Sequence, residues 1–166
     1  SVRDGDTLML DTGTTTSFVA RELARHRQLT VITNSTDIAR TLGSINGNRV
    51  FIAGGEIRGD SGAALGASTV AYLAQFTVKH AVISASAISA DSGITDHDMA
   101  EADIARAILS CGERKIAVAD SSKFQKRGLV QVCPLSGITD LVTEMPPPAQ
   151  LNAVFVQSGV TVTVAR

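Results

Sequence analysis

The chain has 166 residues, 44% of them hydrophobic, and carries 15 Lys and Arg against 16 Asp and Glu. This composition fits one domain with a sizeable core, and the formal charge of −1 argues against a surface that neutralises nucleic-acid phosphates. The start of the chain is polar and no apolar run is long enough to cross a bilayer, so we expect a cytoplasmic protein with no membrane partner.

Short runs rich in β-branched residues alternate with helix-like stretches along the chain. The predicted strands are Thr7–Leu10, Leu29–Thr33, Arg49–Ala53, Lys79–Ser84, Lys115–Ala119, Leu129–Val132, Thr139–Thr143 and Val160–Val164. The predicted helices are Thr15–Arg25, Ser35–Leu42, Ala67–Gln75, Met99–Cys111 and Ala149–Gln157. This order predicts a single α/β domain over residues 1–166, with a mostly parallel sheet flanked by helices. Ligands of such sheets bind beyond the carboxyl ends of the strands.

The first loop at such a strand end is Asp11–Thr16, and its composition suits an anion. Gly13 permits a sharp turn, Thr14, Thr15 and Thr16 offer hydroxyl donors, and the N–H groups of the following helix favour a phosphate. The alternative is that Thr14 or Thr15 only caps the helix. Either interpretation fits this loop taken alone.

Two neighbouring strands end in loops of a similar kind. Thr33 and Asn34 close the second strand, and Gly54 and Gly55 follow the third. Taken singly, Asn34 would be a helix cap and the glycines a turn. Their convergence at one edge of the sheet favours a shared pocket instead.

Charged side chains follow in the second half of the chain. Asp120 and Lys123 lie just past a buried-looking strand, and Lys123 could either neutralise a phosphate or remain solvated. Four carboxylates gather near the start of the helix Met99–Cys111, where negative charge stabilises the helix N-terminus; they are Asp96, Asp98, Glu101 and Asp103. Alternatively, Glu101 turns inward to accept sugar hydroxyls or to act as a base.

Signatures of metals and large cofactors are missing from the sequence. The three histidines, His26, His80 and His97, share no ligand spacing, and Cys111 and Cys133 show neither metal-binding nor disulfide-scaffold spacing. No phosphate loop of the ATP type and no G-x-G-x-x-G follows the first strand. We therefore expect no metal and no cofactor, and a small phosphate ester as ligand.

Read together, the loops resemble the C-terminal effector domain of the DeoR family of bacterial transcriptional regulators, over essentially the whole chain. The matching stretches are Asp11–Thr16, Leu29–Ser35, Ala53–Arg58, Gly66, Glu101–Asp103 and Ala119–Phe124. Within the family, Gln75 and Phe76, Asp91–Gly93 and Pro146–Pro148 look most like glycerol-3-phosphate regulon repressors.

This resemblance implies a fold like that of sugar-phosphate isomerases and CoA-transferases, and a phosphorylated sugar or glycerol 3-phosphate-like effector. It assigns the phosphate to the Thr-rich loop and Lys123, and the rest of the pocket to Asn34, Gly54, Gly55, Glu101 and Asp120. It also implies a homo-oligomer, and an N-terminal winged helix-turn-helix that this sequence lacks. DNA would then be bound only through that absent domain.

An active sugar-phosphate isomerase is the alternative function, and Glu101 would be its base. In related pentose-phosphate isomerases, a Gly-Ala-Asp stretch after a central strand carries a catalytic Asp. The corresponding stretch here is Ser84–Ser86, and no Lys-Gly-Gly follows it. We therefore expect ligand binding without turnover. A third possibility is a purely structural oligomerisation module, which predicts no ligand pocket. The polar strand-end loops argue against it.

Overall fold

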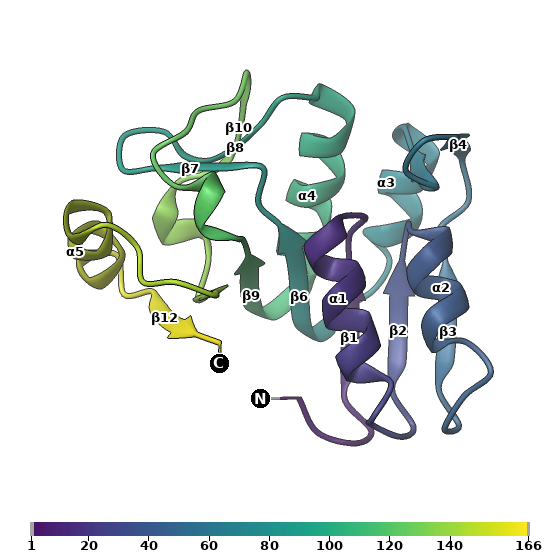
Figure 1. The fold of residues 1–166 in the computed structure, drawn as a ribbon. Coiled ribbons are helices and arrows are strands. Elements are labelled where there is room, and N and C mark those ends of the chain that lie inside the picture. The colour runs from purple at the N-terminus through teal and green to yellow at the C-terminus, as the bar shows by residue number, and fades with distance from the viewer. Residues whose placement is uncertain (1, 166) are drawn as a thin grey trace.

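The computed structural model describes residues 2–165, and its centre is a seven-stranded sheet in the order β12-β11-β9-β6-β1-β2-β3 (Figure 1). Every neighbouring pair in this sheet is parallel. The strands are β1 (Thr7–Leu10), β2 (Thr30–Thr33), β3 (Arg49–Ile52), β6 (Val78–Ser84), β9 (Gly112–Val118), β11 (Asp140–Thr143) and β12 (Thr161–Val164). The predicted fold class, a mostly parallel sheet flanked by helices, is confirmed.

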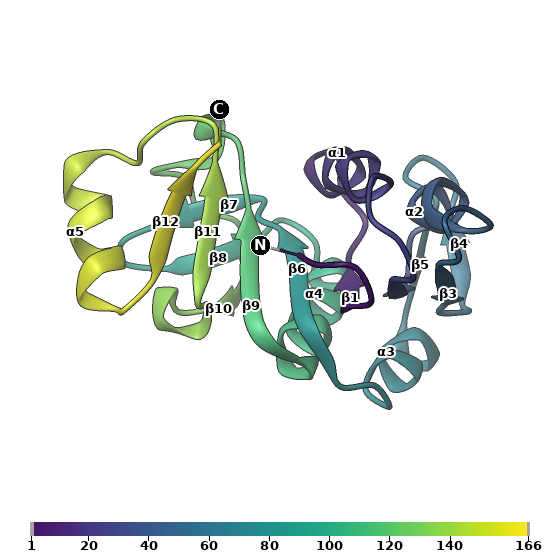
Figure 2. The ribbon, with the colours of Figure 1, turned by 90° about the horizontal axis from the view of Figure 1, so that it is seen from below.

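Helices cover both faces of this sheet, as Figure 2 shows. One face carries α1 (Thr14–Leu23) and α2 (Thr36–Leu42), and the other carries α3 (Ala67–Leu73) and α4 (Met99–Cys111). The side chains of β1 alternate accordingly, because Leu8 and Leu10 join the core cluster of α1 and α2 whereas Met9 joins the cluster of α4. Burial on both faces explains why the central strands are continuously apolar.

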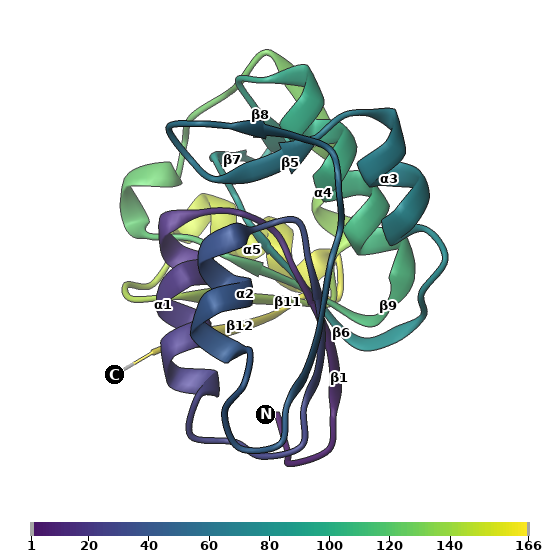
Figure 3. The same cartoon turned by 90° about the vertical axis from the view of Figure 1, so that its right-hand side faces the viewer.

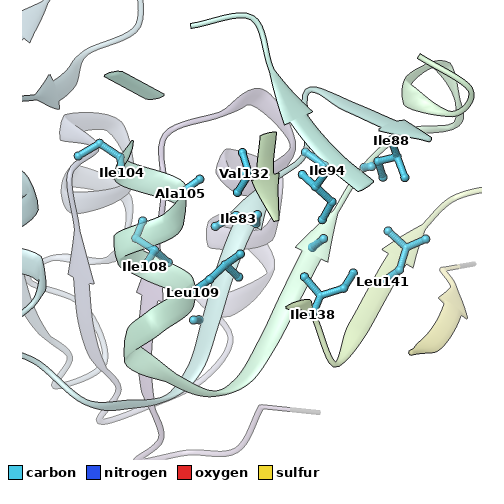
Figure 4. Packing of buried hydrophobic residues seen from close by; sticks show 14 of the residues in the cluster. Ile83, Ile88, Ile94, Ile104, Ala105, Ile108, Leu109, Val132, Ile138 and Leu141 are labelled. Atoms are coloured by element: carbon cyan, nitrogen blue, oxygen red, sulfur yellow. The ribbon is translucent and has the colours of Figure 1, made fainter. Parts of the chain in front are cut away.

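Two smaller sheets complete the architecture. An antiparallel sheet in the order β10-β8-β7 contains β7 (Ala87–Ser89), β8 (Gly93–Asp96) and β10 (Val130–Cys133). Its Ile88, Ile94 and Val132 pack with Leu141 of β11 and Ile108 of α4 in the larger core cluster (Figure 4). The strand predicted at Leu129–Val132 is observed as β10, but it belongs to this separate antiparallel sheet and not to the main parallel sheet. Its partner β8 was not predicted.

The second small sheet is the hairpin of β4 (Glu56–Arg58) and β5 (Ala63–Leu65), also missed in the sequence. Figure 3 shows β5 beyond the end of the main sheet, between the layer of α1 and α2 and the layer of α3 and α4. The remaining elements lie in the second half of the chain. They are two 3-10 turns, Ser121–Lys123 and Leu135–Gly137, and the helix α5 (Ala149–Gln157). Within residues 2–165, no helix is long and apolar enough to span a membrane.

Candidate ligand-binding site

A cavity of about 110 Å³ lies where the carboxyl ends of β1, β2 and β6 meet. Loops after the strands, the end of β8, the hairpin strand β5 and the first turns of α4 all contribute to its wall. The lining residues are Asp11, Thr12, Gly13, Asn34, Ala63, Leu65, Ser84, Ser86, Asp96, Glu101, Ile104 and Ala105. This is the edge at which an open parallel sheet binds ligands.

Three polar atoms of this lining are buried without a hydrogen-bond partner: Asp11 Oδ1, Thr12 Oγ1 and Asn34 Oδ1. The side chains are nevertheless fixed, since Asp11 Oδ2 accepts a hydrogen bond of 2.8 Å from the Ser84 N–H, and Asn34 Nδ2 donates one of 3.0 Å to the Ala64 carbonyl. Asp11 is 7% exposed and Asn34 only 1%. An unsatisfied buried polar group costs about 1–3 kcal/mol, so these atoms are free to bond a polar group that enters the cavity.

Carboxylates dominate the electrostatics of the cavity. Burial raises the pKa of Asp11 well above its ordinary value, and the charges of Glu101 and Asp96 add to this effect, although the Ser84 N–H opposes it. Burial also raises the pKa of Glu101, helped by the charges of Asp96 and Asp98. Asp96 accepts hydrogen bonds of 2.9 Å from the Ser86 hydroxyl and from the Asp98 N–H.

An ion-pair cluster joins the β4–β5 hairpin to the start of α4. Arg58 Nη1 lies 3.1 Å from Asp98 Oδ2 and 3.3 Å from Glu101 Oε1. Asp98 also caps α4, because its Oδ1 accepts a hydrogen bond of 3.1 Å from the Glu101 N–H. Arg58 therefore holds the hairpin beside the cavity and neutralises part of the charge on Glu101.

A larger groove of about 940 Å³ opens on the α1 side of the cavity. Ser84 and Ser86 line both spaces, and Thr14, Thr15, Asp120 and Lys123 line the groove. Helix α1 begins after Gly13 and no side chain caps it, so neither Thr14 nor Thr15 serves as the cap. The first N–H groups of α1 are thus available to an anion.

The chain matches the family described as the DeoR C-terminal sensor domain, over residues 1–145. The chain belongs to this family. The resemblance found in the sequence is thereby confirmed, and the cavity described above lies at the strand ends of a DeoR sensor domain.

Curated relatives of this sensor domain are transcriptional repressors. It is 31% identical over 154 residues to the glycerol-3-phosphate regulon repressor of Escherichia coli, with 93% of this chain and 61% of the relative covered. The glycerol-3-phosphate regulon repressor of Haemophilus influenzae is 33% identical, with 91% and 59% covered. The repressor CsqR of Escherichia coli is 29% identical, with 99% and 63% covered. The chain spans about three fifths of these relatives.

Solved structures share the fold of the sensor domain. A ribose-5-phosphate isomerase in complex with phospho-erythronic acid superimposes with a TM-score of 0.52 at 14% identity, over 74% of this chain and 48% of that one. The tetrameric eIF2B-beta2-delta2 complex from C. thermophilum gives 0.58 at 14% identity, over 95% and 56%. The predicted isomerase-like fold is confirmed.

Eight of the predicted site residues line the cavity or the groove. Asp11, Gly13, Asn34 and Glu101 line the cavity, and Thr14, Thr15, Asp120 and Lys123 line the groove. A third depression of about 470 Å³ joins them along α1, where Gly13, Thr14 and Glu101 also lie. Hydrogen bonding to Ser122 lowers the pKa of Asp120, whose carboxylate caps the 3-10 turn that carries Lys123.

Four other predicted residues, Thr16, Thr33, Gly54 and Gly55, do not line these spaces. The Thr16 hydroxyl donates to the Gly13 carbonyl at 3.0 Å, and the Thr33 hydroxyl accepts from the Ser35 N–H at 3.0 Å. The Gly54 carbonyl accepts from the Thr69 hydroxyl at 2.8 Å, and Gly55 has a φ of 155° and leaves no room for a Cβ beside Thr69. These residues position the loops, whereas we had expected them in the pocket.

Sequence reasoning left four polar lining residues of the cavity out of the predicted site: Thr12, Ser84, Ser86 and Asp96. Thr12 lay inside the recognised loop, and its place between two predicted site residues was the available signal. Asp96 was assigned to the helix N-terminus with Asp98 and Asp103. Asp98 does cap α4 and Asp103 is exposed beside Arg106, but Asp96 ends β8 and lines the cavity.

Proposed function

We propose that this domain binds a phosphorylated sugar or polyol as the effector of a bacterial transcriptional repressor. The observation that carries the proposal is the set of buried, unpartnered oxygens on Asp11, Thr12 and Asn34 around one cavity. Ligand hydroxyls are donors of the right size and charge for these atoms. The names of the glycerol-3-phosphate repressors support the same ligand class.

In this proposal the phosphate lies outside the small cavity, at the start of α1. Backbone N–H groups of that turn, the hydroxyls of Thr14 and Thr15, and the ammonium group of Lys123 would bind it. Asn34 and Asp11 would accept hydrogen bonds from the hydroxyls, and Glu101 would reach the same part of the ligand.

Regulation would follow from differential binding. An effector that prefers one arrangement of the domain, or of a homo-oligomer built from it, shifts that equilibrium and changes how the repressor meets DNA. We assign DNA binding to a part of the full-length protein other than this chain, because the chain spans only 61% of the Escherichia coli relative.

Thermal unfolding in the presence of phosphate esters tests the proposal. Glycerol 3-phosphate, ribose 5-phosphate and fructose 1-phosphate would each be compared with free glycerol and inorganic phosphate. An ester at a hundred times its dissociation constant contributes about 2.7 kcal/mol, which raises Tm by about 5–10 °C for a domain of this size. No shift with any ester would overturn the assignment.

Substitutions at the proposed phosphate position test where the ligand binds. Lys123→Ala and Thr15→Val should each reduce the shift without lowering the Tm of the free protein, since neither side chain belongs to the core. Lys126→Ala is the matched control, because Lys126 is exposed and lines none of these spaces. Equal binding by all three variants would contradict the proposed phosphate position.

A further inference from the structure

The charges around the small cavity define the part of the ligand that enters it. Asp11, Asp96 and Glu101 all line the cavity, and among its described lining residues none is cationic. Arg58, the nearby cation, is already paired with Asp98 and Glu101 at 3.1 and 3.3 Å. A second anionic group on the ligand would therefore meet three carboxylates in a lining that has no cation of its own.

Buried oxygens without a hydrogen-bond partner lie on the same wall as these carboxylates. Asp11 and Asn34 are 7% and 1% exposed, and each presents one oxygen without a partner. Asn34 Oδ1 is an acceptor, because the Asn34 amide nitrogen donates to the Ala64 carbonyl, and Asp11 Oδ1 is an acceptor in the ionised carboxylate. The complementary group is a donor, and an alcohol supplies one without adding negative charge.

The same charges fix the orientation of the ligand. A phosphate dianion placed in the cavity would approach three carboxylates and no cation. The groove also has three carboxylates in its lining, but there Lys123, Arg25 and the uncapped start of α1 offset them. The phosphate therefore stays outside and the opposite end of the ligand enters.

We infer that the site selects phosphorylated polyols whose inner end is a neutral alcohol and rejects the corresponding phosphorylated sugar acids. This inference rests on the proposed function, and it narrows the effector from phosphate esters in general to those with a single anionic end. It also assigns the carboxylates of Asp96 and Glu101 a role in specificity: they exclude acids.

Matched ligand pairs test the inference, because each pair differs only in a CH₂OH or a COO⁻ at the inner end. The pairs are glycerol 3-phosphate with 3-phosphoglycerate, erythritol 4-phosphate with 4-phosphoerythronate, and sorbitol 6-phosphate with 6-phosphogluconate. Isothermal calorimetry at neutral pH should give at least tenfold weaker binding for the acid of any pair whose alcohol binds. Equal or tighter binding of the acid would overturn the inference while leaving the proposed function standing.

Binding by neither member of any pair, together with no response to sugar phosphates, would instead overturn the proposed function. Charge removal supplies the second readout. Glu101→Gln and Asp96→Asn keep the shape of each side chain. Either variant should bind the acid more tightly, so the ratio of alcohol affinity to acid affinity should fall at least threefold. Having two variants keeps the test valid if one fails to fold.

The matched control is Asp103→Asn. Asp103 lies on the same helix and carries the same charge, but it is exposed beside Arg106 and does not line the cavity. Its ratio of alcohol to acid affinity should equal that of the unmodified domain. An unchanged ratio in Glu101→Gln and Asp96→Asn, or an equal change in Asp103→Asn, would contradict exclusion by the cavity wall.

Discussion

The hydroxyl of Ser86 donates a hydrogen bond of 2.9 Å to Oδ2 of Asp96. The sequence comparison with pentose-phosphate isomerases expects Ser86 at the position of a catalytic acid, and β8 brings a carboxylate beside Ser86 from another part of the chain. Both oxygens of Asp96 are occupied, however, because Oδ1 accepts from the Asp98 N–H at 2.9 Å.

We predict that the domain does not isomerise ribose 5-phosphate. A general base must reach the proton that it removes, and the nearby Glu101 is paired with Arg58 at 3.3 Å. Ribulose 5-phosphate formation, followed by its absorbance or by NMR, should equal that of buffer. Turnover that is abolished in Glu101→Gln would overturn this prediction and favour an enzyme.

Replacing Asp11 by Asn should stabilise the free domain at neutral pH, by about 1 kcal/mol, as happens when a strained functional group is removed. Asp11 is buried and its pKa is raised. The folded state therefore holds its proton longer than the unfolded state, and stability falls as pH rises from the unfolded pKa through the folded one.

Urea unfolding from pH 4 to pH 8 measures this effect. The unmodified domain should lose stability over the window that begins near the ordinary Asp pKa of about 3.9, and Asp11→Asn should lose less. The variant should also bind effector more weakly, because an amide N–H would replace one acceptor. If Asp11→Asn were less stable than the unmodified domain at pH 7, and its free energy of unfolding depended on pH to the same extent, burial of the Asp11 carboxylate would not be destabilising.

Asp6, at the amino ends of the strands, should behave in the opposite way. Its carboxylate lies 2.8 Å from Lys79 Nζ and 2.9 Å from His80 Nε2, and His80 is 1% exposed. Burial alone would raise the pKa of Asp6, but hydrogen bonds from Lys79, the Arg3 N–H and His80 outweigh it, and the pKa falls below its ordinary value. Ionised Asp6 therefore contributes to the free energy of unfolding above the pKa that it has in the unfolded chain. This contribution is lost as the pH falls toward the lower pKa of the folded state.

The Lys79 side chain is 44% exposed, whereas His80 is buried, so Asp6→Ala mainly leaves the buried His80 ring nitrogen without its partner. The free energy of unfolding should therefore fall by about 1–3 kcal/mol at pH 7. Effector affinity should not change, since Asp6 lines none of the three spaces of the site. Asp91→Ala, at an exposed position, is the control. A cost no larger than that of the control would contradict a stabilising role for Asp6.

The fold followed from the sequence wherever periodicity ran for a full element. Met99–Cys111 and Ala149–Gln157 match α4 and α5 residue for residue, and the seven central strands were found with small shifts at their ends. The missed strands β4, β5, β7 and β8 have only three or four residues each. Such runs are too short to show alternation, and long-range pairing forms them.

The site was predictable to the level of its loops but not of its side-chain directions. Asp11 and Asn34 were expected at the strand ends, where they lie. Thr16 and Thr33 have the same polarity, but their hydroxyls bond the local backbone, as Ser and Thr side chains often do. Asp96 had a sufficient local explanation at the start of a helix, and only tertiary structure shows that it faces the ligand site instead.

Gly13 should be the least replaceable glycine of the site. Its φ of 179° is extended backbone that any residue adopts, so conformational strain is not the reason. A Cβ at this position would lie 2.6 Å from the Ser84 Cβ, and it would push the β1–α1 turn away from the end of β6. Gly13→Ala should therefore cost about 1–3 kcal/mol of stability, the usual cost of overpacking, and should weaken effector binding at least tenfold.

Gly54→Ala is the matched control, and it also tests a residue that the sequence placed in the pocket. A Cβ at Gly54 meets no atom within 4 Å, and Gly54 lines none of the three spaces. Urea unfolding and calorimetry should both give values near those of the unmodified domain. If Gly54→Ala abolished effector binding while Gly13→Ala did not, the ligand would lie on the β3 side of the sheet edge, and the cavity between Asp11 and Glu101 would not be its site.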